Sequence, residues 1–216
     1  DVSAGRGRVR EKGRPLLDAV LRRRIDPPVA RLAALLVTYG VGANAVTVAG
    51  LVIGLAAAAA IALGSPLLGL MLILLSRLCD GLDGAIAKDT RPTDLGGYLD
   101  IVFDFVFYGA IPLGFAVLNP AQNALPAAVL LLTFYANGAS FLAYAILAEK
   151  RKIATDVRGT KSFFFSTGLA EASETIIAFC LFCLFPGWFP VIALVFAGMT
   201  AWTFAARVWL AVRTFG

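Results

Sequence analysis

Residues 79–105 read CDGLDGAIAKDTRPTDLGGYLDIVFDF and place four carboxylates in sequence that is otherwise apolar enough for a membrane interior. Asp80 and Asp83 are three residues apart, and Asp100 and Asp104 are four residues apart. On an α-helix, either spacing puts both side chains on one face. An ionised carboxylate at the centre of a bilayer costs at least ~2.5 kcal/mol, so we expect cations or water beside these four acids.

The four carboxylates offer only oxygen ligands. The chain contains no histidine, and no cysteine stands at a ligand spacing among the acids. Such a donor set favours hard cations such as Mg²⁺ or Mn²⁺ over zinc or copper, and a shared carboxylate could bridge two ions. Small residues surround the acids: Gly84, Ala85, Ala87, Gly96 and Gly97. Their short side chains predict a pocket beside the metal ions.

The composition is that of an integral membrane protein. Of 216 residues, 59% are hydrophobic and only 15% are charged, and the mean hydropathy is +0.82, which an ordinary soluble domain does not approach. The net charge of +5 comes from short basic tracts between apolar runs. These tracts indicate contact with lipid headgroups, and we expect no nucleic-acid partner.

Six apolar segments have about the ~20 residues that a helix needs to cross a bilayer. They are residues 45–63, 66–87, 95–117, 125–148, 163–185 and 188–212. Lysine and arginine occur in the loops 88–94 and 149–162 and at both ends of the chain, whereas the loops 64–66, 118–123 and 186–188 have none. The positive-inside rule therefore predicts an all-α, multi-pass membrane protein with both termini and the acidic motif on the cytoplasmic side.

The sequence before the first span divides into two parts. Residues 1–14 are basic, small and polar, which predicts a disordered tail. In residues 15–40, apolar residues alternate with arginines on both sides of Pro27 and Pro28. This pattern predicts two short amphipathic helices in the membrane interface, with a break at the prolines. Residues 41–216 would then form one six-helix catalytic domain.

The motif resembles the signature of the CDP-alcohol phosphatidyltransferase family. The match is Asp80-x2-Asp83-Gly84-x2-Ala87-Lys88-x7-Gly96-x3-Asp100-x3-Asp104. The family usually has arginine where this chain has Lys88, which keeps the charge but not the two-pronged guanidinium. The resemblance implies that a phosphatidyl group is transferred from CDP-diacylglycerol to an alcohol, with release of CMP. The chain is similar to bacterial inner-membrane members of the family, and the resemblance implies a homodimer.

The resemblance also implies roles for individual residues. Asp80, Asp83, Asp100 and Asp104 would hold two Mg²⁺ or Mn²⁺ ions, and Asp104 would also take the proton from the acceptor hydroxyl. Substrate would be bound by Asn44, Thr47, Gly84, Ala87, Lys88, Thr93 and Gly96. Among these, Asn44 and Thr47 match a family motif whose usual proline is replaced here by Ala43.

The acceptor alcohol is left open by the sequence, with glycerol phosphate, inositol phosphate, serine and phosphatidylglycerol as candidates. A phosphorylated acceptor would need cations near the metal ions. The candidate acceptor residues are Arg151, Lys152, Arg158, Lys161, Glu171 and Glu174. The alternative is that the basic residues only set topology and that the two glutamates form ion pairs in the bundle.

Arg77, one helical turn before Asp80, is expected to form an intrahelical ion pair that neutralises part of the acidic group.

Two other functions use the same acids. A soluble CDP-choline or CDP-ethanolamine could be the donor, with diacylglycerol as the acceptor. Embedded carboxylates are also typical of divalent-cation transporters. A conduction path, however, needs polar residues across the full thickness of the membrane, and the four acids gather at one leaflet.

Overall fold

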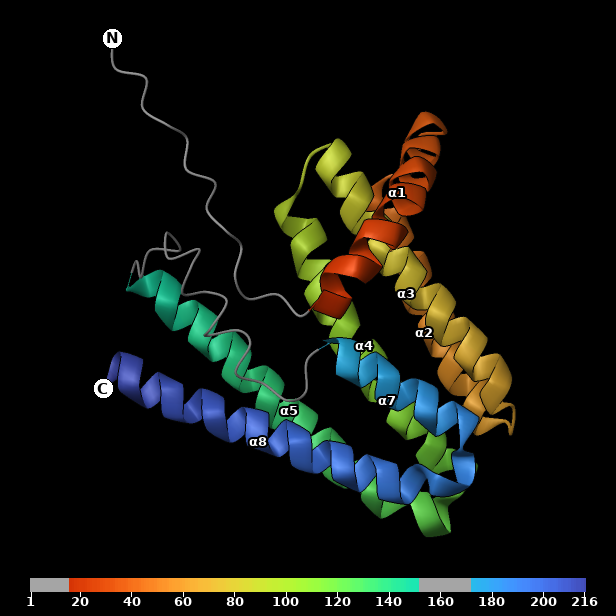
Figure 1. Ribbon diagram of the computed structural model, residues 1–216, viewed down its shortest axis with the longest axis vertical. Helices are drawn as coiled ribbons and strands as arrows, with labels where there is room; N and C mark the ends of the chain where they lie inside the picture. The colour runs from red at the N-terminus through yellow and green to blue at the C-terminus, as the bar shows by residue number, and fades with distance from the viewer. Residues whose placement is uncertain (1–15, 152–171) are drawn as a thin grey trace.

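The computed structural model describes residues 16–151 and 172–216, and these residues form helices and connections without a strand. The elements are α1 (Leu16–Thr38), α2 (Ala43–Ala62), α3 (Pro66–Asp89), α4 (Asp94–Leu118), α5 (Pro120–Lys150), α7 (Ala172–Leu184), the 3₁₀-helix η1 (Pro186–Trp188) and α8 (Phe189–Phe215) (Figure 1). The prediction of an all-α protein is confirmed. The predicted tail, residues 1–14, lies outside the described residues.

Within the described residues, four stretches are long and apolar enough to cross a membrane. They are α2, α4, α5 and the segment Pro186–Phe215, and they coincide with four of the six predicted spans. The predicted span 66–87 is the helix α3, which carries the charged residues of the motif. The predicted span 163–185 is described only at its end, as α7. A count of six spans therefore stays a prediction.

Short connections fold α2, α3 and α4 back on one another. Gly64 has a φ of 85°, a left-handed conformation that ends α2, and the amide of Ser65 donates to the carbonyl of Ala60 over 2.9 Å. Pro66 then begins α3. At the other end of α3, the hydroxyl of Thr93 caps α4 by accepting from the amide of Gly96 over 3.0 Å. The end of α3 and the start of α4, which carry the acidic motif, are thereby adjacent.

Helix α2 packs against both α3 and α4, while α5 packs along α8 and also contacts α4 (Figure 1). The α2–α4 contact is close at Gly54, where a Cβ atom would lie 2.6 Å from Cδ2 of Phe107. Buried aromatic rings fill the core farther along α4. The rings of Phe115 and Phe189 stack with centroids 4.7 Å apart and join α4 to α8. This packing fixes the position of α4 beside the acids of α3.

Helix α1 differs from its prediction. Residues 16–38 form one helix that contains Pro27 and Pro28, so the expected break between two short helices is wrong. A proline removes one backbone hydrogen bond and crowds the preceding turn. Packing offsets this cost, because Ala33 is fully buried and Val29 packs in the same apolar cluster as Leu82 of α3. Contacts with α3 therefore hold the helix together beyond the prolines.

Candidate active site

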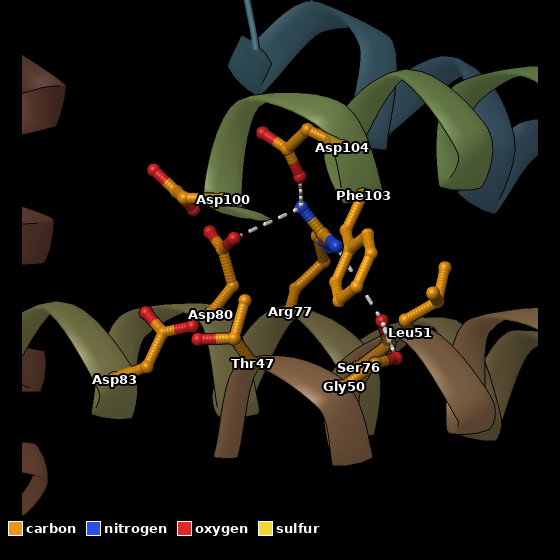
Figure 2. Close-up of a pocket in the computed structure, with 10 residues that line it drawn as sticks. All are labelled: Thr47, Gly50, Leu51, Ser76, Arg77, Asp80, Asp83, Asp100, Phe103 and Asp104. Carbon is orange, nitrogen blue, oxygen red and sulfur yellow. Dashed lines mark hydrogen bonds and ion pairs between the residues drawn. The ribbon is translucent and has the colours of Figure 1, made fainter. Parts of the chain in front are cut away.

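Three carboxylates from two helices meet beside α2. Oxygen atoms of Asp80 in α3 and of Asp100 and Asp104 in α4 all lie within 4.8 Å of one another. Figure 2 shows the side chains of the two helices facing each other across a narrow gap. Asp80 and Asp104 are half-buried, whereas Asp100 is exposed. Three of the four acids of the motif are thus brought together.

Asp83, the fourth acid of the motif, lies next to this group but is not part of it. Its side chain is only 6% exposed, and its Oδ2 atom has no hydrogen-bond partner among the described residues. Asp83 lines a cavity together with Asp80, Asp100 and Asp104. A buried carboxylate oxygen without a donor normally requires a compensating charge or hydrogen bond.

Arg77 connects the two helices through the acids. Its Nη1 atom donates to Oδ1 of Asp104 over 2.7 Å and lies 3.5 Å from Oδ1 of Asp80. The expected intrahelical pair with Asp80 is therefore present. The shorter contact, with Asp104, crosses from α3 to α4. It could not be predicted from the sequence, because it depends on how the two helices face each other.

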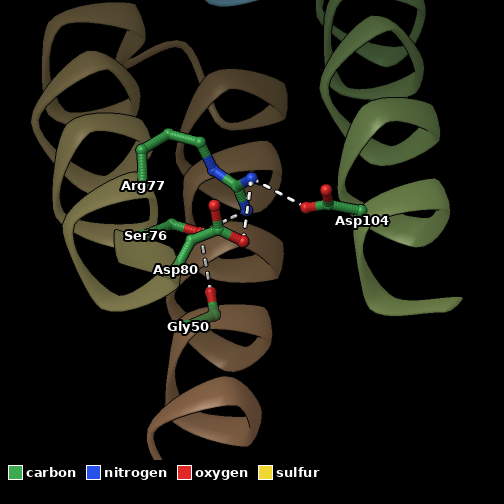
Figure 3. A network of polar contacts seen from close by, with 5 residues as sticks. All are labelled: Gly50, Ser76, Arg77, Asp80 and Asp104. Carbon is green, nitrogen blue, oxygen red and sulfur yellow. Dashed lines mark hydrogen bonds and ion pairs between the residues drawn. The ribbon is translucent and has the colours of Figure 1, made fainter. Parts of the chain in front are cut away.

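The guanidinium of Arg77 also makes one apolar and one polar contact outside the acids, and Figure 3 shows the polar contact, with Ser76. Its carbon Cζ lies 3.9 Å from the centroid of the Phe107 ring. Nη2 lies 3.4 Å from the hydroxyl of Ser76, which itself donates to the carbonyl of Gly50 over 2.8 Å. Residues of α2, α3 and α4 therefore hold Arg77 in position.

A cleft of about 400 Å³ opens beside the acids. It is lined by the start of α2, the end of α3, the connection 90–93 and the start of α4. Six of the seven residues expected to bind substrate line this cleft: Asn44, Thr47, Gly84, Ala87, Thr93 and Gly96. Asp83 and Asp100 lie at its boundary with the acidic group. The pocket that the small residues predicted is thus present.

Lys88 is exposed and does not line the cleft, although Ala87 beside it does. Arg91 is the basic residue that lines the cleft, and its neighbour Thr90 lines it too. From the sequence, Arg91 was only one of the basic residues of the loop 88–94. Its position three residues beyond Lys88, in the short connection between two motif helices, was the available signal.

The residues considered for the acceptor site are only partly described. Lys152, Arg158, Lys161 and Glu171 lie outside the described residues. Arg151 is exposed, donates from Nη2 to the carbonyl of Phe215 over 2.9 Å, and faces that ring. Glu174 is half-buried at the start of α7. Neither residue lines the cleft or the cavity among the acids.

The acidic group fits divalent cations by its chemistry. Its donors are carboxylate oxygens from two helices, with the unpartnered Oδ2 of Asp83 beside them. The chain has no histidine, and no cysteine belongs to the group among the described residues. Mg²⁺ and Mn²⁺ prefer such all-oxygen sites.

Two comparisons of sequence agree with this geometry. The chain is 44% identical to the inner membrane protein YnjF of Escherichia coli over 194 residues, which are 90% of this chain and 94% of that protein. It is 38% identical over 96 residues to the archaetidylinositol phosphate synthase of Methanothermobacter thermautotrophicus. That match covers 44% of this chain and 46% of that enzyme.

Solved structures share the fold. The phosphatidylinositol phosphate synthase of Mycobacterium tuberculosis, with CDP-DAG bound, superposes with a TM-score of 0.66 at 21% identity, covering 86% of this chain and 92% of that chain. A structure of the same enzyme with manganese and citrate superposes with a TM-score of 0.66 at 21% identity, covering 84% of this chain and 87% of that chain. The CDP-alcohol phosphatidyltransferase family model matches residues 41–212, and the chain is therefore a member of the CDP-alcohol phosphatidyltransferase family of enzymes.

Proposed function

We propose that this enzyme transfers a phosphatidyl group from CDP-diacylglycerol to an alcohol and releases CMP. The observation that carries the proposal is that Asp80, Asp100 and Asp104 converge at the edge of a cleft of about 400 Å³. Ligand sites commonly have volumes of about 300–1,000 Å³, so the cleft has room for part of a nucleotide-lipid. The Mycobacterium tuberculosis enzyme that shares this fold was crystallised once with CDP-DAG and once with manganese and citrate, which is consistent with this reaction.

We propose that Asp80, Asp83, Asp100 and Asp104 hold two divalent cations, Mg²⁺ or Mn²⁺. Such ions would neutralise the diphosphate of the donor and stabilise CMP as the leaving group. The carboxylates come from two helices that the α3–α4 connection and the packing on α2 hold together. Binding of the two cations would therefore require little rearrangement of the backbone.

In this proposal Asp104 accepts the proton of the acceptor hydroxyl as that oxygen forms its bond to phosphorus. Asp104 is half-buried, lies ten residues after the start of α4 at Asp94, and accepts a hydrogen bond from Arg77 at Oδ1. While this hydrogen bond is formed, Oδ1 is occupied, so release of Arg77 would free that oxygen to accept the proton.

Substrate binding is assigned to the residues of the cleft. Asn44 and Thr47 present polar groups from α2, while Gly84 and Ala87 leave space along α3. A cation near the diphosphate would come from Lys88, as the family motif suggests, or from Arg91, which lines the cleft.

We propose six membrane spans after a membrane-interface segment at residues 15–40, with the site and both termini on the cytoplasmic side of an inner membrane. In Figure 1 the turns after α2, α4 and α7 lie toward the lower right, whereas the α3–α4 connection lies near the top and the ends of α5 and α8 lie at the left. The second group carries the described basic residues of the loops, Lys88, Arg91, Lys150, Arg151 and Arg213. This grouping is consistent with the positive-inside rule. The name of the Escherichia coli relative is consistent with the inner membrane.

A homodimer is a further proposal, taken from the resemblance to the family. The small residues of α2 do not support it directly. A Cβ on Gly50 would meet Cβ of Cys79 at 3.1 Å, and one on Gly54 would meet Phe107. These glycines serve packing within one chain, so a dimer interface would have to lie on other surfaces.

The test is an assay of CMP release by the purified full chain. CDP-diacylglycerol would be offered with Mn²⁺ or Mg²⁺ and, in separate reactions, glycerol phosphate, inositol phosphate, serine or phosphatidylglycerol. We expect CMP with one acceptor and none after chelation of the metal. A parallel reaction with CDP-choline or CDP-ethanolamine and diacylglycerol tests the reverse arrangement of donor and acceptor. Absence of CMP in every reaction would refute the proposal, and a liposome assay of cation flux would then test transport.

A further inference from the structure

Arg77 occupies part of the acidic group that the proposed function assigns to metal ions. Its Nη1 atom contacts Asp104 at 2.7 Å and Asp80 at 3.5 Å, so one nitrogen is shared by acids of two helices. Two of the three clustered carboxylates are therefore already engaged by a cation that belongs to the chain. A divalent ion and Arg77 would compete for the same negative charge.

The space among the acids is small while Arg77 is in this position. The cavity lined by Arg77 and the four aspartates has a volume of about 10 Å³. A single water molecule needs roughly 10–15 Å³ measured in this way. Asp83 and Asp100 also line the larger cleft, but ions held by Asp80 and Asp104 need more room than this cavity offers, so either Arg77 or these two carboxylates must move when such ions enter.

The contacts of Arg77 favour movement of the guanidinium. It reaches Asp104 through one nitrogen rather than through the two parallel hydrogen bonds of a strong arginine–carboxylate pair. Its Nε atom is buried without a hydrogen-bond partner among the described residues. The contacts with the Phe107 ring and the Ser76 hydroxyl involve no acid of the cluster, and they can persist after Nη1 leaves Asp104.

We propose that Arg77 is the counter-cation of the metal-free acidic group and that it releases Asp104 when divalent cations bind. Arg77 is then a positioning residue that sets how tightly the site holds metal. This inference rests on the proposed function, because release of Asp104 also frees the carboxylate assigned to accept the proton. The exchange keeps the half-buried acids neutralised both before and after the metal ions arrive.

The first test compares Mn²⁺ binding by the wild-type chain and by Arg77→Met, in detergent and without CDP-lipid, from the electron paramagnetic resonance signal of free Mn²⁺. If the Arg77 pair is formed about nine-tenths of the time, its removal strengthens the apparent affinity roughly tenfold. Arg213→Met is the matched control, because Arg213 lies over the ring of Trp209 and is exposed. It should bind Mn²⁺ like the wild type. Unchanged or weaker binding by Arg77→Met would overturn the inference.

Two further measurements keep the test decisive if Arg77→Met does not fold. Arg77→Lys retains the charge but loses the planar contact with Phe107, and its affinity should lie between those of the wild type and Arg77→Met. An experimental structure of the Mn²⁺-loaded wild type should place Nη1 of Arg77 more than 4 Å from Asp104. An intact pair in that structure contradicts the inference.

Mn²⁺ binding, CMP release and the state of the Arg77–Asp104 pair, all measured on the wild type, distinguish this inference from the proposed function. A wild-type enzyme that binds Mn²⁺ and releases CMP with the Arg77–Asp104 pair intact refutes only the role of Arg77. A wild type that neither binds Mn²⁺ nor releases CMP refutes both.

Discussion

Asp80 in α3 and Asp104 in α4 share one nitrogen of Arg77, which lies 3.5 Å from the first carboxylate and 2.7 Å from the second. The two helices are thus joined at the acids themselves as well as through the apolar core. Any substitution at these acids changes both the electrostatic balance of the group and the contact between helices. A loss of activity in a variant of either acid is therefore interpreted together with its melting curve in detergent.

Asp80→Asn should reduce CMP release at least about 100-fold. An amide is a much weaker ligand than a carboxylate, and loss of a metal contact at the transition state is expected to cost ~2.7 kcal/mol or more. The measurement is the initial rate of CMP release at saturating CDP-diacylglycerol and Mn²⁺. The control is Asp89→Asn, an exposed acid at the end of the same helix that does not belong to the cluster. An Asp80→Asn enzyme that is as active as this control would refute the metal assignment.

Asp104→Asn should lower turnover far more than it weakens binding of the CDP-lipid. The amide cannot accept the proton of the acceptor hydroxyl, and general-base catalysis typically contributes about 10²–10⁴-fold. The comparison needs kcat together with the dissociation constant for CDP-diacylglycerol measured without acceptor. A similar loss in both quantities would assign Asp104 a ligand role without a base role. A melting curve in detergent checks that removal of the partner of Arg77 has not unfolded the protein.

Arg91→Gln should raise KM for CDP-diacylglycerol about tenfold and leave kcat less affected. Arg91 lines the cleft, and charge-assisted contacts with phosphate contribute ~1.5 kcal/mol or more.

Lys88→Arg, which restores the usual residue of the family, should retain near-normal activity, and Lys88→Gln tests the charge at that position. If Lys88→Gln raises KM and Arg91→Gln does not, Lys88 supplies the cation for the diphosphate.

Much of this site could be predicted because it depends on local geometry. Residues three or four apart share a helix face, so Asp80 with Asp83 and Asp100 with Asp104 were each expected on one face of a helix, and all four near one leaflet. The contact between Arg77 and Asp104 could not be predicted in this way. It depends on the rotation of α3 relative to α4, and both helices pack on α2, as at Gly54, where a Cβ would meet Phe107 of α4 and Ser76 of α3.

The errors have a similar origin. Pro27 and Pro28 indicate a helix break when only local propensity is considered, but contacts of α1 with α3 override it. Arg91 belongs to a connection without helical periodicity, so its position near Lys88 placed it close to the site but could not show that it lines the cleft. For α1, the missing information was a contact with a helix that is distant along the chain.

Gly96→Ala should raise KM for CDP-diacylglycerol severalfold without unfolding the protein. A Cβ at this position would lie 3.0 Å from Oδ1 of Asn44 and 3.1 Å from Oγ1 of Thr93, so both polar side chains of the cleft must shift. Alanine favours a helix over glycine by about 0.5–1 kcal/mol, which opposes any loss of stability. Gly81→Ala is the matched control, because a Cβ there meets no atom within 4 Å and Gly81 does not line the cleft. The measurements are KM and the melting temperature of both variants. An equal KM for Gly96→Ala and the wild type would mean that Asn44 and Thr93 are not positioned for substrate by this glycine.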